Sequence, residues 1–555
     1  GRWSRGLGDV YKRQLLLMLF AGRSSATSEE SWMLTPRLRS AHQDLVKHPL
    51  YRWLTIVGAG VLGLLIVGVP WFIDTPSRLI TFANVLVTMM VVLSVVVLTG
   101  WAGQLSLGQY AFAAIGAYMT AYYAVELNFF VALVLGVAWG VGAAIVIGVP
   151  ALRLRGLYLG VATLGFALVV SRWMLSIGRL NNNPVGVAKV TPPEIFGRCD
   201  LRTDKQAYYY LCVVALGVVL YLLWRLRRSG VGRTLIAVRD NELTAAAYTI
   251  SPTKAKLIAF AVSGGVGALA GGLLVPGNGS VFPIQFPVSE SLAVMSIAVV
   301  GGISSLTGAV LGTIILVGLP TVFESSSQVR LFSSGLGMLI VLMYFPGGLI
   351  SLVHNGRDAF LTWLAERTEW TPPAKGQQGT VATLSARTHS AETTQPDLAA
   401  LTANDVAVSF GGRLAVAGAS IGVGQGEIVG LIGTTGAGKT TLMNAVSGFV
   451  PSQGEISLFG ERIDGRASHE RARLGIGRAF QNAKLFGSLT VRETVMTALE
   501  ARQRSLLQPS MLGMPPSPRS ERRKRSQADE IIHYLGLGRY ADQLISELST
   551  GTRRI

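Results

Sequence analysis

The sequence predicts a polytopic all-α membrane domain followed by an α/β P-loop domain. Half of the 555 residues are hydrophobic and only 14% are charged, whereas soluble domains carry about 25% charged residues. The apolar residues gather in long stretches between positions 54 and 352, each close to the ~20 residues that cross a ~30 Å hydrocarbon core. Farther along, Gly433–Thr440 (GTTGAGKT) fits the phosphate-binding pattern GxxxxGK[ST].

Residues 1–53 form an N-terminal segment ahead of the membrane domain. Asp9–Gln14 is what one reading frame of a common transposon-end sequencing adapter encodes, so we expect residues 1–14 to be an assembly artefact. The apolar run 15–21 is too short to span a bilayer, and a signal-peptide core is the alternative interpretation. A matching N-terminal peptide from the native protein, found by mass spectrometry, would contradict the artefact.

The predicted membrane domain, residues 54–352, is a series of apolar stretches. The stretch 290–323 would extend about 51 Å as one helix, which is too long for a single crossing. We therefore expect a break at Gly301–Ser305 and either two short spans or a re-entrant pair. About eight to ten crossings result. The stretches run over about 54–73, 79–98, 105–125, 129–149, 156–177, 208–224, 257–275, 290–323 and 332–352.

Basic residues alternate between the loops and orient the domain. They cluster before the first stretch and after the fourth and sixth, so the positive-inside tendency places those loops in the cytoplasm, with ATP. Apart from Arg172 and Glu290, which lie near stretch ends, the stretches contain no Asp, Glu, Lys, Arg or His. Because a proton relay needs titratable groups inside the membrane, a proton-driven carrier is disfavoured.

The net charge of +18 does not indicate nucleic acid as a partner. Most of the excess lies in loops beside the membrane and in one helical run, Arg519–Arg525. We expect this run to be a solvated helix face rather than a binding patch.

Glycine and alanine are dense in Gly103–Gly116 and Ser263–Gly272. Small residues let membrane helices approach closely, so close helix packing is the first interpretation. The alternative is a broken helix that lines a path, with Gln104, Ser106 and Gln109 as its polar groups.

The P-loop predicts its own chemistry. Its glycines let backbone N–H groups turn toward phosphates, Lys439 is expected to neutralise the β/γ charge, and the Thr440 hydroxyl to ligate Mg²⁺. We predict a buried strand at Glu427–Ile432 and a helix at Thr441–Ser447 whose N-terminus faces the anion. ATP and Mg²⁺ are the expected cofactors. The expected contacts in the loop are Gly433, Thr434, Thr435, Gly436, Ala437, Gly438, Lys439, Thr440 and Thr441.

Motifs in the membrane domain resemble the permeases of branched-chain amino acid ABC importers. They cover about 54–352 in the family's order: Leu98–Phe112 with Ile115–Tyr118, Leu152–Tyr158, Val300–Gly308 and Phe345–Leu349. The resemblance implies that Gly232–Ala245 is the coupling segment that docks on the ATPase, through Arg239, Glu242 and Ala245. An ordinary cytoplasmic loop is the alternative. Thr249 stands where the family usually has glycine, and a β-branched residue there bears on the exact turn but not on the role of the segment.

Residues 401–555 resemble the ATP-binding subunit of the same ABC importers. Phe410 matches the aromatic position that stacks on adenine, and Gln481 matches the glutamine that senses Mg²⁺ and the permease. Leu548–Thr552 resembles the ABC signature, which faces the γ-phosphate bound by a partner subunit, although Thr550 and Thr552 replace the usual residues. The implied nucleotide contacts are Phe410, Gln481, Ser549, Gly551 and Thr552, with Thr440 and Gln481 on the metal.

We expect the ATP-binding domain to be incomplete. An ABC ATPase continues after the signature with the Walker B aspartate, the catalytic glutamate and a switch histidine, and none of these is in the sequence. Since they hold Mg²⁺ and polarise the attacking water, we expect a truncated part of a longer protein that hydrolyses ATP poorly by itself. A linker, 353–400, joins the domains, and its 371–398 portion predicts a flexible tether with a reach of about 30 Å.

The resulting hypothesis is a permease fused to its ATPase in an ATP-driven amino acid importer of a bacterial inner membrane, with the ATPase in the cytoplasm. The resemblance implies a second permease, a second ATPase domain and an extracytoplasmic substrate-binding protein as partners, besides the lipid bilayer. Branched-chain amino acids are the expected substrates, with urea, other amides or other amino acids as alternatives. A membrane-tethered nucleotide sensor without transport, or a secondary carrier with a degenerate ATPase, are rivals from other classes.

Overall fold

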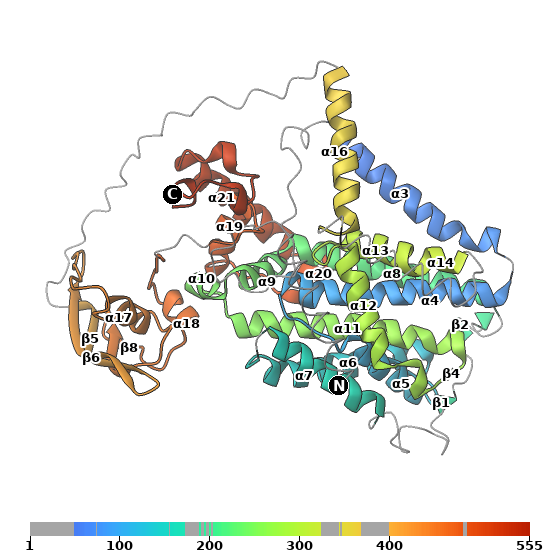
Figure 1. Ribbon diagram of the computed structural model, residues 1–555, viewed down its shortest axis with the longest axis horizontal. Helices are drawn as coiled ribbons and strands as arrows, with labels where there is room; N and C mark the ends of the chain where they lie inside the picture. The colour runs from blue at the N-terminus through green and yellow to red at the C-terminus, as the bar shows by residue number, and fades with distance from the viewer. Residues whose placement is uncertain are drawn as a thin grey trace, which may run out of the picture. The chain divides into compact units, whose positions relative to one another are not determined.

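The computed structural model describes residues 49–73, 75–154, 156–172, 188–189, 194–195, 199–200, 204–322, 343, 347–367, 399–480 and 485–554. All of them lie within the unit Thr35–Ile555, and Figure 1 labels their helices and strands. The expectations for residues 1–14 and 15–21, for the tether 371–398, for most of the stretch 332–352 and for Gln481 lie outside the described residues. We call residues 49–367 the membrane half and residues 399–554 the P-loop half.

In its described residues the membrane half is helical apart from connecting loops and two-residue strands, as predicted. Pro76–Trp101, Phe129–Ala151, Lys205–Arg228, Pro252–Asn278 and Pro283–Gly301 are each long and apolar enough to cross a bilayer. Its helices are α3 (Pro49–Phe72), α4 (Pro76–Val95) continued by the π-helical turn η1 (Val96–Trp101), α5 (Gln109–Tyr123), α6 (Phe129–Ala151), α7 (Leu157–Arg172), α8 (Lys205–Arg228), α9 (Gly230–Asp240), α10 (Glu242–Ala247), α11 (Pro252–Asn278), α12 (Val288–Gly301), α13 (Leu306–Thr313), α14 (Leu319–Val322) and α16 (Leu349–Arg367). The number of crossings stays a prediction.

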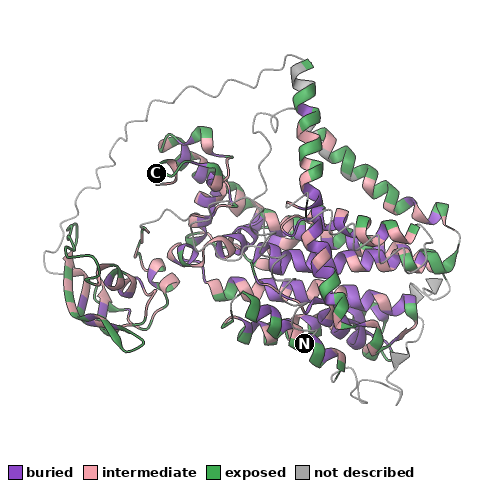
Figure 2. Ribbon diagram, viewed as in Figure 1, coloured by how far each residue is buried: buried purple, intermediate pink, exposed green. Residues whose placement is uncertain are grey.

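Helices α4, α5 and α11 form the buried centre of this half, whereas α6 and α7 keep exposed apolar faces (Figure 2). The two glycine-rich segments meet here. A Cβ on Gly116 would lie 2.1 Å from the Ala268 carbonyl oxygen, and one on Gly271 would lie 1.7 Å from that of Ala113. Close packing through small residues is therefore confirmed.

The predicted break at Gly301–Ser305 is also confirmed. Helix α12 ends at Gly301, Gly302 has a φ of +116°, and α13 begins at Leu306. Gly301 and Gly312 lie against each other, so α13 folds back antiparallel along α12. A second break, residues 102–108, separates η1 from α5.

A proline inside α3 explains one polar contact between membrane helices. Pro70 has no N–H, so the carbonyl of Ile66, four residues earlier, loses its helical partner. The Tyr209 hydroxyl of α8 donates to that carbonyl at 2.7 Å. Lipid offers no replacement for a lost backbone partner, so this bond fixes α3 against α8.

The P-loop half contains two small cores. The first surrounds an antiparallel sheet of order β6-β5-β7-β8, with α17 (Lys439–Val446) packed on β5 and β6. The second is built from α19 (Val491–Ala498), α21 (Ser517–Tyr534) and the turns after it. The other elements are β5 (Ala399–Phe410), β6 (Arg413–Gly424), β7 (Gln453–Leu458), β8 (Glu461–Arg462), α18 (Ser468–Arg473), η5 (Leu499–Ala501), α20 (Leu507–Leu512), η7 (Ile545–Glu547) and η8 (Thr552–Arg554).

The prediction of a buried strand at Glu427–Ile432 is wrong for this structure. The segment has no strand geometry, and Ile428 and Ile432 are 98% and 96% exposed. A strand needs a neighbour to take up its N–H and C=O groups. Among the described strands none pairs with this segment, because the sheet contains only β5 to β8. The helix predicted after the loop is present as α17.

Candidate nucleotide site and coupling interface

The P-loop curls around the ammonium group of Lys439. Lys439 Nζ donates to the carbonyl oxygens of Gly433 and Thr434, both at 2.7 Å. Gly436 and Gly438 have φ values of +91° and +84°, which glycine adopts without strain. A side chain on Gly438 would also meet the Ala415 carbonyl oxygen at 2.4 Å. The loop thus presents a half-buried lysine at the N-terminus of α17, a donor set that suits phosphate.

The hairpin that carries Phe410 lies beside this loop. Strand β5 ends at Phe410, and β6 returns after the Gly411–Gly412 turn to place Ala415 and Val416 against Gly438. The Phe410 ring is 52% exposed. An exposed aromatic ring near a phosphate loop suits the predicted stacking on adenine, which stays a prediction.

The predicted signature residues lie apart from the P-loop in the described structure. Ser549 Oγ accepts from the Thr552 N–H at 3.2 Å and so caps the short helix η8. Leu548 belongs to the core of α19 and α21, whereas α17 belongs to the core of the sheet. The positions of Ser549, Gly551 and Thr552 agree with a surface that faces another subunit, a role that stays a prediction.

Helix α18 connects the P-loop helix to the membrane half. The buried guanidinium of Arg471 donates to the last carbonyls of α17, at 2.8 Å to Ala445 and 2.9 Å to Val446. Burial lowers the pKa of Arg471, and the charge of Asp464 opposes this shift. Two residues on, Arg473 Nη2 donates to the Thr249 carbonyl oxygen at 2.9 Å. One short helix therefore holds both the end of α17 and the end of α10.

The segment predicted to couple the halves forms helices α9 and α10. Ala245 is fully buried, and Tyr248 packs edge-on against Phe486 with ring centroids 5.9 Å apart. Arg239 points back into the membrane half and donates to the Gly100 carbonyl oxygen at 2.5 Å. Glu242 pairs with Lys256 of α11 at 2.8 Å, within the membrane half. Of the three predicted residues, Ala245 is fully buried, whereas Arg239 and Glu242 bond to groups of the membrane half.

Thr249 adopts the left-handed conformation that a glycine would favour, with a φ of +67°. Its N–H donates to the Ala246 carbonyl and that of Ile250 donates to the Ala245 carbonyl, the pattern of a Schellman C-cap. The turn is therefore the one that glycine usually makes, and the β-branched residue occupies it with strain.

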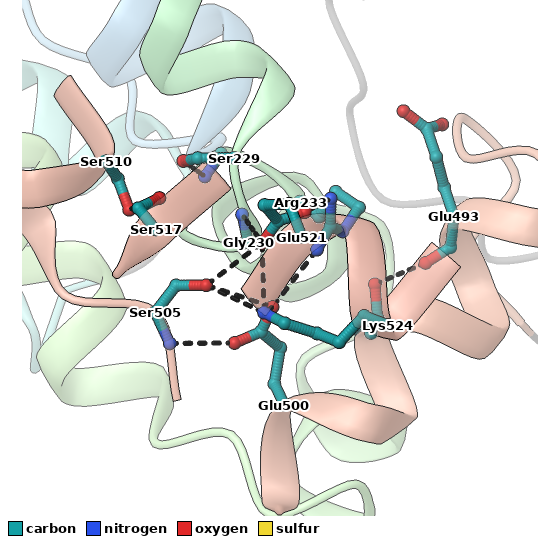
Figure 3. A network of polar contacts seen from close by, with 12 residues as sticks. Ser229, Gly230, Arg233, Glu493, Glu500, Ser505, Ser510, Ser517, Glu521 and Lys524 are labelled. Atoms are coloured by element: carbon teal, nitrogen blue, oxygen red, sulfur yellow. Dashed lines mark hydrogen bonds and ion pairs between the residues drawn. The ribbon is translucent and has the colours of Figure 1, made fainter. Parts of the chain in front are cut away.

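A buried cluster of four charges joins the halves beyond this segment (Figure 3). Arg233 of α9 donates to Glu500 Oε1 at 3.1 Å and to Glu521 Oε2 at 2.6 Å. Lys524 Nζ donates to the same two carboxylates, at 2.5 and 2.9 Å. Ser505 and the Gly230 N–H complete the hydrogen bonding of the carboxylates. We name Arg233, Glu500, Glu521 and Lys524 the ion cluster.

The ion cluster is balanced only when the halves are together. Its P-loop side holds two carboxylates and one ammonium, and Arg233 supplies the missing positive charge. Burial alone would raise the pKa of Glu521, but the hydrogen bond and charge of Arg233, followed by Lys524, hold it below its ordinary value. The ionised carboxylate is therefore stabilised by a residue from the other half.

The ion cluster shows that the predicted solvated face at 519–525 is partly wrong and that two charged residues of the interface were not predicted. Arg519, Arg522, Arg523 and Arg525 are exposed as expected, but Lys524 in the same run is fully buried. Neither Glu500 nor Glu521 was predicted as a site residue. The only sequence signal was the three-residue spacing of Glu521 and Lys524, which indicates a helical ion pair but no third partner.

Comparisons with known proteins divide the chain in the same way. Residues 76–344 match the family described as branched-chain amino acid transport system / permease component, and residues 416–555 match the ABC transporter family. The chain is 29% identical over 352 residues to the high-affinity branched-chain amino acid transport system permease protein LivM of Salmonella typhimurium. This alignment covers 57% of this chain and 82% of the relative.

The P-loop half has relatives of more than one kind. It is 34% identical over 155 residues to the high-affinity branched-chain amino acid transport ATP-binding protein BraF of Pseudomonas aeruginosa, 28% of this chain and 61% of the relative. It is 39% identical over 155 residues to the lipopolysaccharide export system ATP-binding protein LptB of Haemophilus influenzae, 28% of this chain and 58% of the relative. The chain thus spans less than two thirds of the length of these two ATP-binding relatives.

Proposed function

We propose that the chain is the fused permease and ATP-binding component of an ATP-driven amino acid importer, because residues 76–344 match the branched-chain amino acid transport permease family and residues 416–555 match the ABC transporter family. The multi-pass helices of the membrane half form the permease. The P-loop half supplies the nucleotide site, and α9 and α10 lie between the two.

The contact that carries the proposal is the one made by α18. Arg471 of α18 donates hydrogen bonds to the C-terminal carbonyls of the P-loop helix α17. Arg473, also of α18, donates to the Thr249 carbonyl at the end of α10. A displacement of α17 on nucleotide binding is therefore transmitted to α10 through one rigid turn of helix. A sensor without transport does not need such a link, and a secondary carrier does not need the P-loop.

The residues of the loop fit ATP with Mg²⁺. Lys439 and the backbone N–H groups of residues 436–440 would hold the phosphates, Thr440 would hold the metal, and Phe410 would stack on the base. When bound, ATP and Mg²⁺ supply the free energy of nucleotide binding and phosphoryl transfer. We propose Gln481 as a further Mg²⁺ contact, and Ser549, Gly551 and Thr552 as contacts to the nucleotide of a second ATP-binding domain.

Branched-chain amino acids are the proposed substrates, because the permease relatives carry that function in their names. The P-loop half does not decide the substrate, since it is similar to ATP-binding proteins of both amino acid import and lipopolysaccharide export. We propose a second permease and an extracytoplasmic substrate-binding protein as partners. The proposed location is the bacterial inner membrane, with the P-loop half in the cytoplasm.

The test is uptake of radiolabelled leucine into proteoliposomes that contain the complete transporter, the binding protein outside and ATP inside. The wild-type protein is expected to accumulate leucine only when ATP is present. Lys439→Ala is expected to abolish uptake because it removes the charge that faces the phosphates, whereas Arg522→Ala, on the exposed face of α21, is expected to leave it unchanged. Uptake that survives Lys439→Ala would refute ATP as the energy source.

A further inference from the structure

Two breaks in the membrane helices lie against each other. The first, residues 102–108, follows the π-helical turn η1, and the second, residues 302–305, separates α12 from α13. The indole Nε1 of Trp101 donates to the Ser304 carbonyl oxygen at 3.1 Å. At Gly100, even a Cβ atom would lie only 2.0 Å from the Ile303 carbonyl oxygen. Because the two breaks are in direct contact, a movement of one displaces the other.

Arg239 of α9 is attached to the first break. The N–H groups of residues 102–104 turn back to the carbonyls of residues 97–99, and the Gly100 carbonyl receives Arg239 Nη1 at 2.5 Å. The arginine stem lies on Gly103, where a Cβ atom would meet Arg239 Cγ at 2.7 Å. With only 6% of its side chain exposed, Arg239 has little freedom to move independently of the break.

Asp240 connects this arginine to the P-loop half. Its Oδ1 accepts from Arg239 Nε at 3.0 Å and Nη2 at 2.8 Å. Its Oδ2 accepts from the Ser488 backbone N–H at 2.7 Å, and Oδ1 also accepts from the Ser488 hydroxyl at 3.2 Å. Ser488 lies two residues beyond Phe486, which packs on Tyr248. Hydrogen bonds therefore lead from Ser488 through Asp240 and Arg239 to the Gly100 carbonyl, and the next residue in the chain, Trp101, bonds to Ser304.

From this series we propose that Asp240 and Arg239 are positioning residues that transmit the movement of the P-loop half to both helix breaks. The inference rests on the proposed transport function and specifies how it reaches the membrane. Charge-assisted hydrogen bonds are the stronger ones in proteins, so the buried pair moves as a unit. The breaks are where these helices can rearrange, because their backbone groups are not held by a continuous helical ladder.

The chain contains a matched control for this pair. On α16, Arg357 donates to Asp358 Oδ1 through Nε at 3.1 Å and Nη2 at 3.0 Å, the same geometry between adjacent residues. Asp240 differs in that it also binds Ser488 of the other half. Asp240→Asn and Asp358→Asn therefore make the same chemical change, but only the first interrupts the series.

The experiment measures ATP hydrolysis and leucine uptake together, with the complete transporter and binding protein in proteoliposomes. Asp240→Asn is expected to lower leucine transported per ATP about tenfold, the effect of one lost charge-assisted hydrogen bond, while hydrolysis changes by less than about threefold. Arg239→Lys, which keeps the charge but loses the fork that reaches both partners, is expected to behave similarly. Asp358→Asn is expected to match the wild type.

Hydrogen exchange gives a second measurement on the same proteins. In the wild type, ATP is expected to change the exchange of residues 99–108 and 302–306 as well as that of the P-loop. In a folded Asp240→Asn protein, ATP should protect the P-loop as before and leave both breaks unchanged. A variant with normal leucine transported per ATP and a normal response at the breaks would overturn the relay alone, whereas a wild type without ATP-dependent uptake would overturn the proposed function and the relay with it.

Discussion

Removing Arg233 tests how strongly the ion cluster holds the two halves together. Arg233→Met keeps most of the apolar stem but deletes the bonds of 3.1 and 2.6 Å to Glu500 and Glu521. The side chains of Arg233 and Glu500 are only 4% and 7% exposed, so water cannot replace the arginine as a partner of the carboxylates. Breaking a buried pair from one side typically costs about 3–5 kcal/mol. This corresponds to a shift in the docking equilibrium of roughly 10²-fold to several thousand-fold.

Hydrogen exchange in lipid nanodiscs measures that shift. The Gly230 N–H donates to Glu521 Oε1 and the Ser505 N–H donates to Glu500 Oε2, so both amides report on the ion cluster. Arg233→Met is expected to speed their exchange by about 10²-fold to several thousand-fold. The double variant Arg233→Met/Glu521→Gln restores the balance of charge and is expected to exchange more slowly than Arg233→Met alone. If the second substitution brings no recovery, or the first changes exchange by less than tenfold, charge balance does not hold the interface.

Three further predictions concern other contacts. Thr249→Gly relieves the strain of the left-handed conformation and is expected to stabilise the turn by about 1 kcal/mol. The backbone amides at positions 249 and 250 should then exchange about fivefold more slowly, relative to their intrinsic rates. Faster exchange would show that the turn is unstrained. Tyr209→Phe leaves the Ile66 carbonyl without its 2.7 Å partner and is expected to cost about 1–3 kcal/mol in reversible unfolding from micelles, whereas Tyr210→Phe, which removes only a 3.5 Å contact, should cost little. Acidification should weaken docking: the lowered pKa of Glu521 means that its contribution is complete above the ordinary glutamate pKa of about 4.3 and is lost as pH falls through the lowered value. Amide exchange at Gly230 should therefore accelerate, relative to its intrinsic rate, only below about pH 4.

Local chemistry was enough to predict several parts of the fold. The length of the 290–323 stretch and its glycines predicted the break that the structure has at residues 302–305, because a helix of that length exceeds the membrane. The spacing of Gly436, Gly438 and Lys439 likewise predicted a phosphate loop that opens a helix. In both cases the decisive residues are neighbours in the chain.

Contacts between residues far apart in the sequence could not be predicted from local chemistry. Arg233 and Glu521 are separated by 288 positions, and nothing in the run 519–525 distinguishes the buried Lys524 from its exposed arginine neighbours. The apolar segment Glu427–Ile432 has the composition of a strand but pairs with none of the described strands, because a strand depends on a neighbour that its own residues do not specify.

The sequence by itself determined the membrane helices, the break after Gly301 and the phosphate loop, since spans, turns and glycine-dependent backbone conformations depend on residues within a few positions of one another. Only the tertiary structure decided which charges are buried, that Asp240 binds Ser488, and that α18 holds α17 and α10 together. Those contacts join residues that are far apart in the chain, and the cost of burying a charge depends on the partner found there.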